Sequence, residues 1–177
     1  MIALRSLRWP DDRAALLALD TSFTTDRIFR LERTGNGVTL DEVAAVPPIH
    51  KSYSLAGIAD VLANHEWVQI AEHGQEIAGI ASMTIDAWNR RAVLQHLYVT
   101  REARRAGVGN ALVTAAIQTA RAQNARCLWV ETQTVNYAAV LFYRHMMFTW
   151  CGFDTSLYDP GDTGADEVAL FFSRELH

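Results

Sequence analysis

Three strand-like segments joined by very short turns constrain the fold of this chain more than any other feature of its sequence. The segments run from about 66 to 72, from 76 to 87 and from 91 to 99. The turns His73-Gly74-Gln75 and Trp88-Asn89-Arg90 separate them. Because turns of this length join antiparallel neighbours, we expect a three-stranded antiparallel meander in the middle of the chain.

Helix and strand patterns on both sides of the meander predict a mixed sheet. Further strands are expected at 2–8, 126–132, 148–158 and 167–176. Helices are expected after Pro10 and at about 54–64, 107–123 and 136–147. Between Thr21 and Pro48 the periodicity is weak, and only turn signals stand out. The predicted fold class is α/β, with a mixed, mostly antiparallel sheet of about seven strands flanked by helices, in one domain over 1–177.

Composition excludes several classes of protein. The chain has 177 residues, half of them apolar, and a net charge of −4, which argues against a nucleic-acid partner. It has no apolar run of membrane-spanning length and no signal peptide, so we expect a cytoplasmic protein without a membrane partner. Cys127 and Cys151 are too few for a disulfide framework or a zinc site, and we expect buried free thiols and no bound metal.

A glycine-containing turn links the third meander strand to the longest predicted helix. It reads Arg104-Arg105-Ala106-Gly107-Val108-Gly109. Glycine lets the backbone turn tightly and approach a ligand, and the N–H groups at a helix start favour an anion such as a pyrophosphate. A P-loop and a Rossmann turn are excluded, because no Gly-Lys-Ser/Thr follows and the preceding strands form a meander. A plain tight connection with exposed arginines remains the alternative.

The same turn, with the strand before it, resembles the acetyl-CoA motif of the GNAT superfamily of N-acetyltransferases. That motif reads Arg/Gln-x-x-Gly-x-Gly/Ala, and Arg104, Gly107 and Gly109 match its three fixed positions. The resemblance covers about 66–176 and implies acetyl-CoA as co-substrate. It also implies that the pyrophosphate binds the backbone N–H groups of Arg105, Ala106, Gly107, Val108, Gly109 and Asn110. Pantetheine would run alongside Leu97, Tyr98 and Val99.

A second block resembles the strand and helix that close over the cofactor in this superfamily. It contains Glu131 and then Asn136, Ala139, Phe142 and Tyr143. The continuation Gly152-Phe153-Asp154-x-x-Leu157-Tyr158, with Trp88-Asn89-Arg90, looks like the streptothricin acetyltransferase branch. The usual Gly-Phe after the helix tyrosine is Met147-Phe148 here, and we expect this change to alter how the helix ends.

Acetyl transfer to an amine requires a base and an acid. In an alternating strand, Val93, Gln95, Leu97 and Val99 would share one face, and Leu94, His96 and Tyr98 the other. The family often places a Glu or His on the active-site face, where this chain has only Val93 and Gln95. We therefore interpret His96 as structural and Glu131 as the candidate base, acting through water, or else as a carboxylate that fixes the loop or the sheet opening.

Tyr143 matches the general-acid tyrosine of the family, and a tyrosine packed beside the cofactor is the alternative. The oxyanion partner implied by the resemblance is a backbone N–H near Leu97 or Tyr98. Residues expected to line the acceptor pocket are Asp26, Tyr53, Trp88, Asp154 and Tyr158.

Several functions and assemblies remain open at this stage. The leading one is acetylation of a primary amine on a small molecule, such as a streptothricin-like antibiotic. A protein acetyltransferase for lysine or N-terminal amines and a non-catalytic acyl-CoA-binding module are the alternatives. Relatives in the superfamily are often dimers, so a homodimer is one assembly that the resemblance allows.

Overall fold

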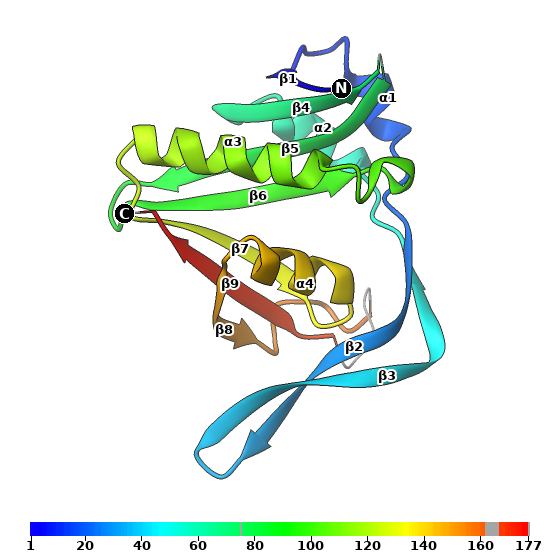
Figure 1. Ribbon diagram of the computed structural model, residues 1–177, viewed down its shortest axis with the longest axis vertical. Helices are drawn as coiled ribbons and strands as arrows, with labels where there is room; N and C mark the ends of the chain where they lie inside the picture. Colours follow the sequence, from blue (N-terminus) through cyan, green and yellow to red (C-terminus); the bar gives the residue numbers. More distant parts are fainter. Residues whose placement is uncertain (75, 162–166, 177) are drawn as a thin grey trace. The chain divides into compact units, whose positions relative to one another are not determined.

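The structure is a computed structural model that describes residues 1–74, 76–161 and 167–176. Its strands are β1 (Ile2–Ser6), β2 (Phe23–Thr34), β3 (Gly37–Lys51), β4 (Trp67–His73), β5 (Glu76–Asp86), β6 (Arg91–Val99), β7 (Cys127–Gln133), β8 (Thr149–Asp154) and β9 (Ala169–Glu175). Its helices are α1 (Arg13–Leu17), α2 (Ala56–Leu62), α3 (Val108–Ala122) and α4 (Tyr137–His145), with a short 3-10 turn at Arg101–Ala103. Figure 1 shows these elements coloured along the chain.

The described strands form one large sheet and one hairpin. Seven strands are hydrogen-bonded in the order β1-β4-β5-β6-β7-β9-β8, and β2 pairs with β3 in a separate two-stranded sheet. The pairs β1–β4, β4–β5, β5–β6 and β8–β9 are antiparallel. These observations confirm the predicted α/β class with its mixed, mostly antiparallel sheet. In the expected turn after β4, Gln75 lies outside the described residues.

The chain divides into two compact units built from interleaved segments. The first unit contains Met1–Phe23, Ser52–Trp129 and Glu175–His177, and the second contains Thr24–Lys51 and Val130–Arg174. Each unit therefore needs segments that are distant in the sequence. Whether the chain behaves as a single domain stays a prediction.

The first unit has the predicted meander with helices on both faces of its strands. On one face, Leu16 of α1 and Leu62 of α2 pack with Val68, Ile70 and Ile80 in a fully buried cluster. Because neighbouring strand residues face opposite ways, Gly79 faces the other side. A Cβ at Gly79 would lie 3.1 Å from Val108 and 3.3 Å from Leu112, so α3 packs closely there. Figure 1 shows α3 running along β5 and β6.

A β-bulge in β6 overturns the predicted faces of this strand. Ser82 of β5 is paired with His96, but the next residue, Met83, is paired with Leu94, so Gln95 is an extra residue on β6. The extra residue reverses the alternation at this point. Val93 therefore shares a face with His96, whereas strict alternation had placed them apart. Gln95 lies on this face as well. Its Nε2 donates to Oγ1 of Thr84 at 3.1 Å, and Thr84 is the residue paired with Val93.

The second unit contains a hairpin that the sequence patterns did not predict. Its strands β2 and β3 occupy the stretch where the periodicity was weak, and most of their residues are exposed. Phe29 and Ala45 are among the few buried apolar residues in this hairpin. A strand that is exposed on both faces shows no apolar alternation, which explains why the pattern failed.

The predictions for the two cysteines are half correct. Both are free thiols, and Cys127 is buried, but Cys151 is exposed. Cys151 lies on β8, the last strand in the sheet order, where a register shift falls between Trp150 and Gly152. The expectation that Cys151 is buried is therefore wrong, because an edge strand leaves more side chains accessible than a central strand does.

The described part of the chain contains no helix long and apolar enough to cross a membrane. Within that same part, no group of three or more His, Cys, Asp or Glu side chains is placed to hold a metal ion.

Candidate active site

The glycine-containing turn, residues 104–109, has the backbone geometry expected of an anion site. We call this segment the phosphate turn. Gly107 precedes α3 with a left-handed φ of 91°, and Arg105 also has a positive φ of 63°. No side chain caps the start of α3. By helix geometry, the first N–H groups of α3 lack intrahelical acceptors and carry the positive end of its dipole. This geometry is compatible with the predicted binding of an anion by the backbone, and the binding itself stays a prediction.

Arg104 holds this turn in place. Its guanidinium donates to the backbone oxygen of Val99, and to those of Ser22 and Thr21 at 2.6 and 2.9 Å. Partial burial is the main cause that lowers the pKa of Arg104. Arg105, in contrast, is exposed beside the turn. Arg104 therefore adds rigidity as well as charge to the turn, and a role of Arg105 in binding the pyrophosphate stays a prediction.

The strand leading into the turn lies partly open. Leu97, Tyr98 and Val99 are half-buried, which leaves part of each side chain accessible. Ala106 and Asn110 are exposed, Gly109 is half-buried, and Val108 is buried in the first turn of α3. The first unit thus brings together all the residues predicted for the pyrophosphate and pantetheine sites.

Asn136 begins the helix that carries the predicted acid. Its side-chain oxygen accepts a hydrogen bond from the N–H of Ala139 at 3.2 Å, so Asn136 is the N-cap of α4. The spacing from Asn136 to Ala139 therefore has a local explanation. Phe142 lies next to Tyr143 in the chain, with ring centroids 5.4 Å apart. The cofactor-binding roles of Asn136, Ala139 and Phe142 stay predictions.

Tyr143 is buried on α4, with a relative exposure of 5%. Its ring packs edge-on against Phe148 at 5.6 Å and lies 6.3 Å from Phe172. The ring of Tyr143 is therefore held by neighbouring aromatic side chains. Both interpretations of Tyr143, general acid and packing residue, are compatible with this position.

The helix end after Tyr143 is not altered by the loss of glycine. Met147 adopts a left-handed φ of 64°, and its N–H donates to the oxygen of Arg144. The N–H of Phe148 donates to the oxygen of Tyr143, which completes the Schellman ending that glycine usually permits. The expectation of a changed ending is therefore wrong, because Met147 accepts the strained conformation.

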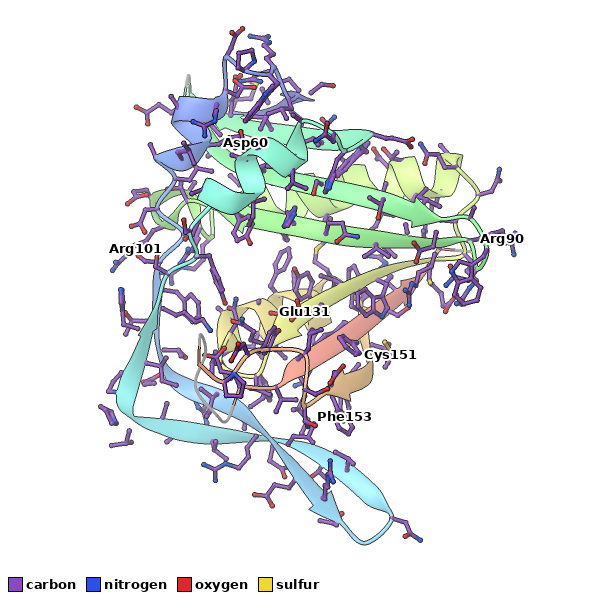
Figure 2. All side chains as sticks on the ribbon, turned by 180° about the vertical axis from the view of Figure 1, so that it is seen from behind. Asp60, Arg90, Arg101, Glu131, Cys151 and Phe153 are labelled. Carbon is purple, nitrogen blue, oxygen red and sulfur yellow. The ribbon has the colours of Figure 1, made fainter. Side chains whose placement is uncertain are left out.

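Glu131 lies in a polar cluster of the second unit, which consists of Glu131, Tyr158, Lys51 and Glu167. It projects from β7 and accepts a hydrogen bond from the hydroxyl of Tyr158, another predicted site residue. Lys51 and Glu167 form an ion pair in the same unit, with side chains only 17% and 10% exposed. Burial raises the pKa of Glu131, while Tyr158 and the positive charge of Lys51 lower it. Figure 2 labels Glu131 on β7, and Cys151 and Phe153 on β8.

This cluster has the properties of a proton-accepting site. A carboxylate whose pKa is raised by burial takes up a proton more readily than an exposed one. Tyr158 holds one oxygen of Glu131, and Lys51 reduces the negative charge of the cluster. A net negative charge remains when Glu131 and Glu167 are ionised, which favours a cationic ligand.

Sequence reasoning missed Lys51 and Glu167. Lys51 is the only lysine in the chain, and it ends a strand that the periodicity did not reveal. The occurrence of one lysine in a sequence whose other basic residues are arginines could have indicated a special role for Lys51. Its partner could not be inferred, because the two residues are 116 positions apart.

The other predicted acceptor residues are divided between the units. Asp26 lies exposed on β2, and Asp154 holds a local turn by accepting bonds from the N–H and hydroxyl of Ser156. In the first unit, Tyr53 lies 6.1 Å from Tyr98, ring to ring. Trp88 is 87% exposed in the turn before β6, at the opposite end of that strand from the phosphate turn.

The fold agrees with comparisons to known proteins. The chain belongs to the acetyltransferase (GNAT) family, whose model matches residues 39–148. This match confirms the expected enzyme class, an N-acetyltransferase.

Two further comparisons cover nearly the whole chain. The streptothricin acetyltransferase of Streptomyces lavendulae is 36% identical and matches 96% of this chain and 92% of its own length. The crystal structure of a nourseothricin acetyltransferase superposes with a TM-score of 0.88 at 37% identity, covering 99% of both chains. These similarities confirm the resemblance to the streptothricin acetyltransferase branch.

A third relative was solved with the co-substrate. A Bacillus anthracis protein assigned as a streptothricin acetyltransferase, in complex with acetyl coenzyme A, has a TM-score of 0.82. It is 25% identical, and the match covers 99% of both chains.

Proposed function

We propose that this enzyme transfers the acetyl group of acetyl-CoA to a primary amine of a streptothricin-class antibiotic. The observation that carries the proposal is the nearly full-length similarity, at 36–37% identity, to acetyltransferases of streptothricin and nourseothricin. The similarity is not confined to the phosphate turn, because it also spans the segments that hold Lys51, Glu131 and Tyr158. The proposal includes a cytoplasmic location, where acetyl-CoA is available.

Acetyl-CoA supplies an acetyl group that is activated as a thioester. In the proposal, the N–H groups from Arg105 to Asn110 bind its pyrophosphate, and β6 lies alongside its pantetheine. Asn136, Ala139 and Phe142 also take part in binding acetyl-CoA in the proposal. A backbone N–H near Leu97 or Tyr98 stabilises the negative charge that develops on the carbonyl oxygen.

Glu131 and Tyr143 move the protons. At pH 7 only about one lysine-like amine in 2,500 is neutral, so the acceptor must lose a proton before it can attack. Glu131 takes this proton, directly or through water. Its raised pKa brings it nearer to the operating pH, where a general base works best. Tyr143 donates its hydroxyl proton to the departing sulfur, so that the products are an amide and a free thiol.

Free thiol release during acetyl transfer tests the proposal. Wild-type enzyme, Tyr143→Phe and Tyr137→Phe would be assayed with streptothricin, polyamines and lysine peptides. Tyr137 is a control on the same helix, where it is half-buried and its hydroxyl donates to Glu42. We expect release with streptothricin, a loss of about 100-fold or more in Tyr143→Phe and little change in Tyr137→Phe.

The other outcomes separate the alternatives. Release of free thiol only with lysine peptides would indicate that the acceptor is a protein rather than a small molecule. Binding of acetyl-CoA without release for any amine would favour the non-catalytic module, an outcome consistent with Gln95 at the position where relatives often carry a base. If acetyl-CoA did not bind, the role of the turn at Gly107 would be wrong. A homodimer stays a prediction.

A further inference from the structure

Five aromatic rings in the first unit form a continuous row. The row consists of Phe23, Tyr53, Tyr98, His96 and His65, in that spatial order. Successive ring centroids lie 6.0, 6.1, 6.1 and 5.8 Å apart. The last two steps are stacked, with planes inclined by 21° and 7°. We call these five residues the aromatic row.

The row is assembled from separate parts of the chain and is held firmly. Oγ1 of Thr21 donates to the oxygen of Tyr53 and accepts from its N–H, which ties together the segments that bear Phe23 and Tyr53. The guanidinium of Arg104 also donates to the backbone oxygen of Thr21. His96 and Tyr98 lie two residues apart on β6 in regular pairing, so they face the same side. Such preorganisation reduces the entropy that a ligand must overcome on binding.

The row is accessible and lies on a functionally relevant face. All five residues are half-buried, so none of them is completely covered. The exposed Gln95, which occupies the position where relatives often carry a catalytic side chain, projects from the same face. Tyr53 is independently predicted to contact the acceptor.

The electrostatic character of the row favours a cation. Ring faces carry a negative quadrupole, which attracts ammonium and guanidinium groups within about 6 Å. Burial and the neighbouring His65 lower the pKa of His96 to about 4, so His96 is uncharged at pH 7. Its ring therefore does not repel a cation.

One end of the row has polar atoms whose partners are missing. Oγ of the fully buried Ser82 and Nδ1 of His65 have no hydrogen-bond partner among the described residues. Ser82 is paired with His96 across the strands and faces the same side. Buried polar atoms are rarely left unsatisfied, so a polar ligand group or an ordered water at this end would complete them.

We propose that the aromatic row binds a second cationic group of the acceptor, an ammonium or guanidinium distinct from the amine that is acetylated. This inference rests on the proposed function and defines its acceptor class more closely, as a molecule with at least two positive charges. The row would hold the acceptor by cation–π contacts, while N–H donors or accompanying water satisfy Ser82 and His65.

Calorimetric binding of streptothricin tests the inference separately from turnover. The variants are Tyr53→Leu, next to the Phe23 end of the row, and His65→Leu at the other end, with Tyr53→Phe as the conservative change. His73→Leu is the control, because His73 is exposed at the end of β4 and lies outside the row. We expect Kd to rise about threefold to thirtyfold in both Leu variants and to stay within about twofold in Tyr53→Phe and His73→Leu.

Equal Kd values in all four variants would overturn the inference. So would an effect of Tyr53→Phe as large as that of Tyr53→Leu, because the hydroxyl rather than the ring face would then bind the acceptor. Thiol release by the wild type, measured in parallel, decides the proposed function independently. If the wild type acetylates streptothricin and the Leu variants bind it normally, only the aromatic row is disproved.

Discussion

Two tyrosine–glutamate pairs in the second unit show how strongly surroundings affect a carboxylate. The hydroxyl of Tyr137 donates to Glu42 on the surface, and that of Tyr158 donates to Glu131 in the polar cluster. Burial raises the pKa of Glu131. The same residue pair can therefore be a surface contact in one place and part of a proton-accepting site in another.

The Tyr158→Phe variant should shift the pH profile of kcat/KM. The hydrogen bond from Tyr158 stabilises the charged form of Glu131 and lowers its pKa, so removing this bond raises the pKa further. A base works only when deprotonated, and the acidic limb of the profile should therefore move to higher pH. Tyr137→Phe should leave the limb in place. An unshifted limb in Tyr158→Phe would exclude Glu131 as the titrating base.

His96 should make the fold sensitive to mild acid. Its pKa lies at about 4 in the folded protein, below the ordinary histidine value of 6.5, so the unfolded chain binds a proton first as the pH falls. The free energy of unfolding should therefore decrease from about pH 6.5 down to about pH 4. Urea unfolding at several pH values should show a smaller decrease in His96→Asn than in the wild type. An equal decrease in His96→Asn would contradict this assignment.

At the scale of elements, the end of α4 stores strain that glycine would relieve. Met147 is 73% exposed and takes a left-handed conformation that disfavours residues with a Cβ. Met147→Gly should raise the free energy of unfolding by about 0.5–1 kcal/mol, because the Schellman bonds remain while the strain disappears. Urea unfolding measures this gain, and kcat should remain near the wild-type value. A destabilised variant would show that the Met147 side chain contributes packing that outweighs the strain.

The bulge in β6 is the element-scale feature with the widest effect on the candidate site. A single extra residue, Gln95, moves His96 onto the face that carries Thr84 and Val93. This change brings Val93 and Gln95 to the same face as His96 and the aromatic row. A one-residue shift in register has this effect because side chains alternate strictly along a strand.

At the scale of the whole molecule, stability should depend on acetyl-CoA. A ligand that binds only the folded state at one hundred times its Kd adds about 2.7 kcal/mol to the free energy of unfolding. Gly107→Ala should reduce this gain, because a Cβ is strained at its φ of 91° and distorts the backbone that receives the pyrophosphate. Thermal unfolding with and without acetyl-CoA measures both effects. A full ligand-induced shift in Gly107→Ala would place the phosphates elsewhere.

The interleaving of the two units is also a property of the whole chain. The last segment returns to the first unit, where the N–H of Leu176 donates to the oxygen of Arg126, and Leu176 is buried. The oxygen of Leu176 accepts from Arg121 at 3.0 Å. Distant segments of the chain therefore have to come together before either unit is complete.

The sequence by itself determined the meander, the helix α3 and the turn that begins it, because periodicity and glycine act over a few neighbouring residues. It also indicated Asn136 and Tyr143 through a motif confined to one helix. Only the tertiary structure decided the hairpin of β2 and β3, the pairing of Lys51 with Glu167 and the face of His96. These features depend on strand register and on contacts between distant residues, which local patterns do not encode.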